Sequence, residues 1–536
     1  MMNDFAASAG MTRPSVQVPL LDRMLVTEVT GDFSLPDYQP EIKRLLRIGV
    51  GVLPPTCTGS GRDTEMSGAL DYYVLYMGHD NALWCAPLST EYRLAFPVED
   101  NLGDVSAGEP FVCLGDVTTE APVGRVTAPR RLSIRCKVQA HVRMYGECLL
   151  QSEEGSGEDV EVLTGHGEVA RTWRTMGEMI PLQDDILLPM GGAERRVVCA
   201  EGSVMMQEAI PADGGVHLRG EVTVKLTVTP EESAAAFASD EITPVNPTPV
   251  PEIIRRKIPF SATVELDGVT PTCAATACGY CTDLSVQMEE GQLHVDLGVI
   301  PEVRAQRNEP VTYVKDLYST RHRLSTRHAT LPTEKGCRAI NGNFTLSDSL
   351  PLSEMGMEPD ATVVDVTATA MPEALAVDAS KGRCVLSGKC LAHLLLLRDG
   401  EYASSTMELP FRYEFDDTDA VSDGTSFDGS VTVLHCRGRS DGERASFDAE
   451  LAVSLRTHAS APVTALSDTV EDTSPDRTAR RRGEYVVCFP APTDSLWSVA
   501  KRYHAPMTAL TAANNLPSGV PADAPESLSD VKYLIV

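Results

Sequence analysis

Apolar and polar residues alternate along most of the chain, in short segments separated by turns. Three such segments, 68–76, 220–228 and 388–396, each begin with glycine. Alternation with a period of two places the apolar side chains on one face of a strand, as in an antiparallel sheet that covers a core on one side. The pattern therefore predicts a mainly β chain built from small sandwich-like domains.

The glycine-led segments belong to a longer pattern that occurs three times. Each is followed by a loop, by a short segment that ends in phenylalanine and by a further alternating stretch. The phenylalanine segments are 94–96, 258–260 and 409–411, and the later stretches are 132–142, 284–297 and 446–455. Any two β domains share alternation, so a chance likeness is the alternative, but the common order favours three repeats. We predict consecutive units at 1–175, 176–315 and 316–465.

The end of the chain has a different pattern. Residues 466–482 lack hydrophobic periodicity and are predicted to be a linker. In the following domain, 483–536, a short strand at 485–487 precedes a helix, because Leu496, Val499, Ala500 and Tyr503 share one helical face. A second helix is predicted from Pro506 to Asn514, and a final strand at 533–536. The order is β-α-α-β.

This tail resembles a LysM domain. The resemblance is carried by the segments 485–487, 494–503 and 534–535 and by Leu510, Asn514 and Leu516. In LysM domains, the loop before the first helix and the loop after the second form a groove for chains of N-acetylglucosamine (GlcNAc). The resemblance thus implies a site for a glycan or a protein partner at Thr493, Asp494, Ser495, Leu496, Trp497, Lys501, Arg502, Asn514, Asn515 and Leu516.

Further segments resemble the SPOCS domain, namely 35–47 (LPDYQPEIKRLLR), 72–76 (YYVLY) and 128–132 (APRRL). Several SPOCS repeats followed by one LysM domain is the layout of spore-coat morphogenesis proteins of clostridia. That resemblance implies a non-enzymatic scaffold of the mother-cell cytoplasm and spore-coat surface. It also implies that the LysM domain docks to the ATPase that forms the basement layer of the coat.

The alternative is a LysM protein that binds peptidoglycan of the cell wall or spore cortex. Two departures from the LysM pattern favour a protein partner over a glycan: Thr493 replaces the usual glycine, and the second loop is long and acidic. Trp497 lies off the apolar helical stripe. It is either an anchor for the partner, as buried aromatic residues often are, or it packs against a nearby strand or linker.

Charge and composition narrow the possible functions. The 536 residues include 46 Lys and Arg against 76 Asp and Glu, a net charge of −30. Such a balance argues against general nucleic-acid binding and against anionic membranes. No run of about 18 apolar residues predicts a membrane span. The N-terminus lacks a basic start followed by an apolar run, so we expect no signal peptide, a cytoplasmic location and reduced cysteines.

Candidate chemistry is sparse. Cys273, Cys278 and Cys281 have a spacing reminiscent of iron–sulfur proteins, but a cluster needs a fourth thiolate. The tetrapeptide Ser-Thr-Arg-His occurs at 319–322 and again at 325–328. It suggests a basic strand edge, and the alternatives are a docking site for an acidic partner and a metal site at the two histidines. No motif pairs a nucleophile with a base. We therefore expect no enzymatic activity, no cofactor and no metal.

Overall fold

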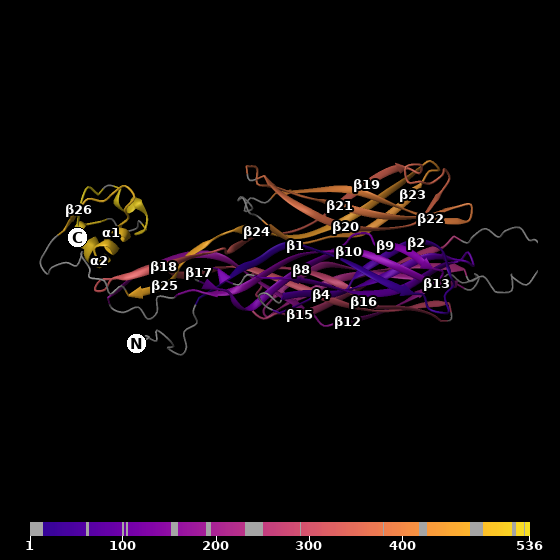
Figure 1. The fold of residues 1–536 in the computed structure, drawn as a ribbon, viewed down its shortest axis with the longest axis horizontal. Coiled ribbons are helices and arrows are strands. Elements are labelled where there is room, and N and C mark those ends of the chain that lie inside the picture. The colour runs from indigo at the N-terminus through magenta and orange to yellow at the C-terminus, as the bar shows by residue number, and fades with distance from the viewer. Residues whose placement is uncertain are drawn as a thin grey trace, which may run out of the picture.

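Strands dominate the part of the chain that the computed structural model describes. The described residues are 14–59, 64–98, 101–102, 105–151, 159–188, 195–230, 250–289, 291–378, 380–416, 426–471, 486–516, 521–529 and 531–536. Three β-sandwiches form the body of the protein, and a small domain with two helices lies at one end of an elongated molecule (Figure 1). The predicted mainly β class with a two-helix C-terminal domain is confirmed.

The first sandwich is made of two antiparallel sheets. Its first sheet has the order β1-β10-β8, with β9 beside β10, and its second has β4 between β2 and β5. The bounds are β1 (Ser15–Ser34), β2 (Ile42–Val52), β3 (Thr56–Thr58), β4 (Thr64–Gly78), β5 (Leu83–Phe96), β6 (Asn101–Leu102), β7 (Val105–Ser106), β8 (Gly108–Thr119), β9 (Val123–Ala128) and β10 (Arg131–Leu149).

The second sandwich repeats this arrangement. Its last strand, β17, pairs with β11 and β12 along one edge and with β16 along the other, and β14 lies between β13 and β15 in the facing sheet. The bounds are β11 (Val160–Met176), β12 (Ile180–Leu187), β13 (Arg195–Ala212), β14 (Gly215–Pro230), β15 (Glu252–Glu265), β16 (Ala274–Glu289) and β17 (Gln292–Ser319).

The third sandwich has the same strand order, β19-β24-β23 facing β20-β21-β22. Its bounds are β19 (Glu334–Pro351), β20 (Thr362–Asp378), β21 (Arg383–Arg398), β22 (Glu401–Asp416), β23 (Ser426–Ser440) and β24 (Arg444–Ser460). In every unit the first strand pairs with the last, so each sandwich closes on its own core. Because β11 pairs with β17, the segment from 160 belongs to the second sandwich, although the sequence placed it in a unit ending at 175.

The repeated glycines mark the same position in each sandwich. Gly220 pairs with Phe260 and Gly388 pairs with Phe411, and the aromatic ring lies against the glycine in both cases. A Cβ at Gly388 would lie 2.3 Å from a backbone oxygen, so no other residue fits there without a shift. In the first sandwich the partner of Gly68 is Tyr92. The sequence alignment on Phe96 was therefore displaced by four residues.

The predicted linker is partly a strand. Residues 463–471 form β25 (Val463–Glu471), which pairs with β18 (Leu324–Leu331) in a two-stranded sheet. The ladder runs up to Leu324 and Glu471 and continues the body toward the C-terminal domain (Figure 1). Residues 472–482 of the predicted linker lie outside the described residues. The interpretation of 466–471 as linker was wrong because these residues pair with a strand more than 130 positions away.

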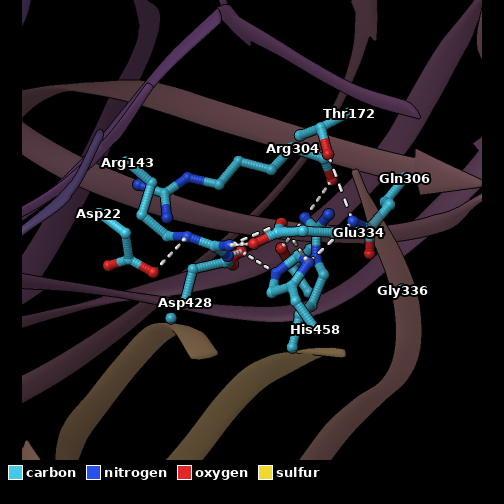
Figure 2. A network of polar contacts seen from close by, with 12 residues as sticks. Asp22, Arg143, Thr172, Arg304, Gln306, Glu334, Gly336, Asp428 and His458 are labelled. Atoms are coloured by element: carbon cyan, nitrogen blue, oxygen red, sulfur yellow. Dashed lines mark hydrogen bonds and ion pairs between the residues drawn. The ribbon is translucent and has the colours of Figure 1, made fainter. Parts of the chain in front are cut away.

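Three arginines at equivalent positions join the sandwiches into a ring. Arg143, Arg304 and Arg456 each occupy the thirteenth residue of the last strand of their unit, and all three are buried. Figure 2 shows Arg143 and Arg304 in this network, which mixes residues of all three sandwiches. Buried charge is costly unless it is paired, and each guanidinium has a polar partner in another sandwich.

The contacts of these arginines run in one direction around the ring. Arg143 Nη2 lies 2.8 Å from Glu334 Oε2 in the third sandwich. Arg456 Nη2 donates to the carbonyl oxygen of Arg304 in the second, at 2.7 Å. Arg304 Nη1 lies 2.8 Å from Asp116 Oδ1 in the first. Each sandwich therefore directs its arginine at one neighbour and accepts an arginine from the other.

A second junction also draws residues from all three sandwiches. Arg47 of β2 contacts Glu201 of β13 at 2.8 Å and Asp365 of β20 at 3.0 Å. Lys225 of β14 binds both carboxylates, at 2.6 and 2.8 Å. Arg255, at the more exposed margin, lies 3.5 Å from Asp365, so opposite charges compensate each other in a largely buried site.

Candidate functional site

The C-terminal domain packs two helices and one 3-10 turn on a two-stranded sheet. Its elements are β26 (Val487–Cys488), α1 (Leu496–Arg502), α2 (Met507–Asn514), η3 (Pro525–Leu528) and β27 (Leu534–Ile535). Cys488, Val499, Leu510 and Leu534 are among the buried residues of its core. The strand begins at Val487, whereas the sequence placed it at 485–487, and residue 485 lies outside the described residues.

The loop before α1 is held by polar contacts at its end. Ser495 caps the helix by accepting a hydrogen bond from Ser498 N at 3.2 Å, and its own N–H donates to Ser498 Oγ at 2.9 Å. Asp494 accepts from Ala491 N at 2.9 Å and forms an ion pair with Arg502. The hydrogen bond from Arg502 and that from Ala491 lower the pKa of Asp494. The loop geometry is thus fixed by short-range capping.

The second loop lies across the start of the same helix. Ser527 Oγ accepts from Leu496 N at 2.9 Å, and Ala522 O accepts from Trp497 N at 2.9 Å. These two amides belong to the first turn of α1, where no intrahelical acceptor exists. The loop after α2 is therefore tied to the N-terminus of α1, next to the loop that precedes this helix.

The remaining predicted residues of this region follow α2. Asn514 donates from Nδ2 to Ile535 O at 2.8 Å and accepts at Oδ1 from Ile535 N at 2.7 Å, which joins the end of α2 to β27. Asn515 ends the helix in the left-handed conformation, with φ of 47°, and is exposed. Leu516 packs against the domain core. Thr493 is exposed in the first loop.

Trp497 and Lys501 face the body of the protein. The indole nitrogen Nε1 of Trp497 donates to Asp316 Oδ2 at 2.8 Å, and the Trp497 ring meets Tyr318 edge-on, with centroids 4.9 Å apart. Lys501 Nζ lies 2.6 Å from Asp316 Oδ1. Burial opposes ionisation of Asp316, but the hydrogen bonds from Lys501 and Trp497 outweigh it and lower its pKa. Trp497 packs on strand β17, the second of the two roles that the sequence left open.

The repeated Ser-Thr-Arg-His motif contributes to the same contact between the body and the C-terminal domain. Thr326 Oγ1 accepts from Lys501 Nζ at 3.1 Å, and His328 Nε2 lies 3.3 Å from Asp316 Oδ1. Ser319 O lies 2.7 Å from His504 Nδ1. The motif therefore contacts the C-terminal domain. Asp316 and Tyr318, which carry most of this contact, gave no signal in the sequence, because they occur in an alternating strand like many others.

The three spaced cysteines do not converge. Cys273 is buried near Val216 and Val303, Cys281 packs in the core of the second sandwich, and Cys278 lies near the Tyr280 hydroxyl. Among the described residues, no three His, Cys, Asp or Glu side chains are grouped so as to hold a metal ion. Within the same part of the chain, no helix is long and apolar enough to span a membrane.

Comparison with known proteins identifies the fold of the tail. Residues 491–521 match the family model of the LysM domain. The match spans the loop before α1, both helices and the start of the second loop. No curated protein and no solved structure matches the chain. The likeness of the sandwiches to SPOCS domains therefore stays a prediction.

Proposed function

We propose that the chain is a non-enzymatic scaffold that carries a LysM domain as a binding head for GlcNAc-containing glycans, such as peptidoglycan. The support is the LysM match at 491–521, since LysM domains bind such glycans through the two loops beside their helices. The three sandwiches would act as a rigid support. In this proposal the acidic charge of the chain plays no part in recognition of the neutral sugar units.

The observation that carries the proposal is the junction of the two loops at the N-terminus of α1. Hydrogen bonds from Leu496 N and Trp497 N hold the second loop, and the contacts of Ser495 hold the first, so both loops are in place before a ligand arrives. Exposed Thr493 and Pro525 lie on the two loops and would line the groove. A preformed site loses less conformational freedom on binding than a flexible one.

A second candidate function is docking to a protein. The resemblance to spore-coat morphogenesis proteins implies that this partner protein is the ATPase of the coat basement layer in the mother cell. Docking is favoured by an apolar patch on the LysM domain, formed by Val487, Phe489 and Tyr533, which are 52%, 75% and 56% exposed. Such a patch on an otherwise polar domain is typical of a protein interface. The docking face would then be the β26–β27 side, because Trp497 and Lys501 of α1 already contact Asp316.

The test measures both ligands with the full chain. Sedimentation with purified peptidoglycan and titration with chitin oligomers should show binding, and Ser527→Ala should weaken it several-fold by loosening the second loop. Ser529→Ala is the matched control, because its hydroxyl bonds only Glu526 O on the same loop and is exposed. Failure of the folded chain to bind either glycan overturns the proposal. Capture of the purified ATPase that is lost in a Phe489→Ser, Tyr533→Ser variant would establish the second candidate instead.

A further inference from the structure

Two cysteines from different sandwiches meet at a junction where all three units pack together. Cys85 lies on β5 of the first sandwich and Cys199 on β13 of the second. Around them is an apolar cluster to which the first sandwich contributes Leu75, the second Val198 and the third Leu395. The two thiols are 114 positions apart in the sequence, so only the tertiary fold brings them together.

The sulfur atoms are close enough to be joined with little movement. Cys85 Sγ and Cys199 Sγ lie 3.0 Å apart, whereas a disulfide bond measures about 2.05 Å. An approach of about 1 Å is within reach of small rotations of the two side chains. The two free thiols already make a hydrogen bond to each other.

The backbone around the pair is fixed on both sides. Arg196 Nη2 donates to Leu83 O at 2.7 Å, and the Arg196 guanidinium lies 4.0 Å from the centre of the Trp84 ring. On the other side of the junction, Gln39 Nε2 donates to Cys85 O at 3.1 Å. Because β5 and β13 are held together next to the thiols, their separation is a property of the junction and not of two loose side chains.

We propose that Cys85 and Cys199 are a redox modification site, at which a low-molecular-weight disulfide forms a covalent cross-link between the first and second sandwiches. Cys85 attacks first, because it is half-buried whereas Cys199 is 4% exposed. The hydrogen bond with Cys85 and burial raise the pKa of Cys199 well above its ordinary value. Cys199 is therefore the resolving residue.

The reaction balances as two thiol–disulfide exchanges. The Cys85 thiolate attacks one sulfur of the small disulfide, so that a mixed disulfide forms and one small thiolate leaves. Cys199 then loses its proton and attacks the Cys85 sulfur, which releases the second small thiolate. The protein loses two thiols, the small disulfide is reduced to two thiols, and the two protons pass from the cysteines to the leaving groups.

A second close pair in the chain provides the control. Cys57 and Cys113 interact within the first sandwich, where the Cys57 thiol and burial raise the pKa of Cys113. A bond between them would not join two sandwiches. A Cys57→Ser, Cys113→Ser variant removes this pair and leaves the junction of Cys85 and Cys199 intact.

The experiment treats the folded full chain with oxidised glutathione and maps the products by mass spectrometry after alkylation. We expect a peptide that contains Cys85 linked to Cys199, and the loss of two of the 14 thiols of the chain. The midpoint temperature of unfolding should lie several degrees above that of the reduced chain. The Cys57→Ser, Cys113→Ser variant should form the same link. Cys199→Ser should instead stop at a glutathione adduct on Cys85.

A stable glutathione adduct at Cys85 in the wild-type chain, or unmodified Cys85 after the other half-buried thiols have reacted, would overturn the proposal. A linked peptide that forms only in urea would do the same, because it would show that the folded junction does not bring the sulfurs together. The mapping on wild-type protein keeps the test valid even where a serine variant folds poorly.

Discussion

Replacing Asp316 by alanine should detach the LysM domain from the body without unfolding either part. The Asp316 carboxylate is the common partner of Trp497 and Lys501, the two residues that α1 directs at the body. Its removal leaves the ring contact between Trp497 and Tyr318 in place. The domain therefore keeps this apolar contact and the hydrogen bonds of His504 and Tyr318, but it loses the carboxylate that orients α1.

The structure sets the size of the effect. A hydrogen bond to a charged acceptor contributes about 1.5–3 kcal/mol, which applies to the buried indole N–H. Lys501 is 28% exposed, so its ion pair contributes about 1 kcal/mol or less after solvent screening. Together the loss is about 2–4 kcal/mol, which corresponds to a shift of about 30- to 1000-fold in the ratio of docked to detached domain.

One backbone amide reports this equilibrium directly. Met507 N donates to Glu161 Oε1 at 3.2 Å, and as the first residue of α2 it has no intrahelical acceptor. Hydrogen–deuterium exchange resolved at Met507 should therefore accelerate in Asp316→Ala. Lys315→Ala is the control, since it breaks only the more exposed ion pair with Asp523 at the same junction and should change exchange little. Equal exchange in Asp316→Ala and the wild type would refute the reasoning.

Four further substitutions test the body. Arg304→Met should cost about 3–5 kcal/mol in urea unfolding, because it removes the ion-pair partner of Asp116 and leaves Glu302 with Arg174 alone. Arg456→Met should cost less, since two of its guanidinium nitrogens are without a partner in the described structure. Burial lowers the pKa of His458, so the unfolded chain binds a proton at a higher pH than the folded chain does. The midpoint temperature of unfolding should therefore decrease as the pH is lowered below about 6.5, and it should decrease less in His458→Gln. Gly388→Ala should destabilise by about 1–3 kcal/mol in the same denaturation assay, whereas Gly108→Ala, with 4.0 Å of room, should not.

Local pattern was sufficient for the strands and for the LysM helices. Period-two alternation located β4, β14 and β21, and the stripe through Leu496 and Val499 located α1, because these signals depend only on neighbouring residues. The strand β25 was missed, since it is stabilised by pairing with β18 far away in the chain. The alignment of the first repeat on Phe96 failed for a related reason: Tyr92, not phenylalanine, covers the glycine there.

In the candidate site, too, the local features could be predicted from the sequence and the long-range contacts could not. The capping role of Ser495 follows from its place before a helix, and the αL conformation of Asn515 is typical of a helix end. The hydrogen bond from Trp497 to Asp316 could not be predicted from the sequence, because the two residues are 181 positions apart. Long-range polar contacts carry no local periodicity, so residues that seemed available to a partner already had one within the chain.

The buried arginines explain why three similar sandwiches form one ordered body. In β10 the even positions from Leu132 to Met144 form the core of the sandwich, so Arg143 points to the opposite face, which alternation predicts to be exposed. That face is covered because Glu334 and Asp428 of the third sandwich neutralise it. An apolar junction would tolerate several arrangements of such similar units. Arg143 and Arg304 each require a neighbour that presents carboxylates at the right place. Arg456 requires a neighbour that presents the carbonyl oxygen of Arg304 and the Thr276 hydroxyl, and the ring therefore closes in a single order.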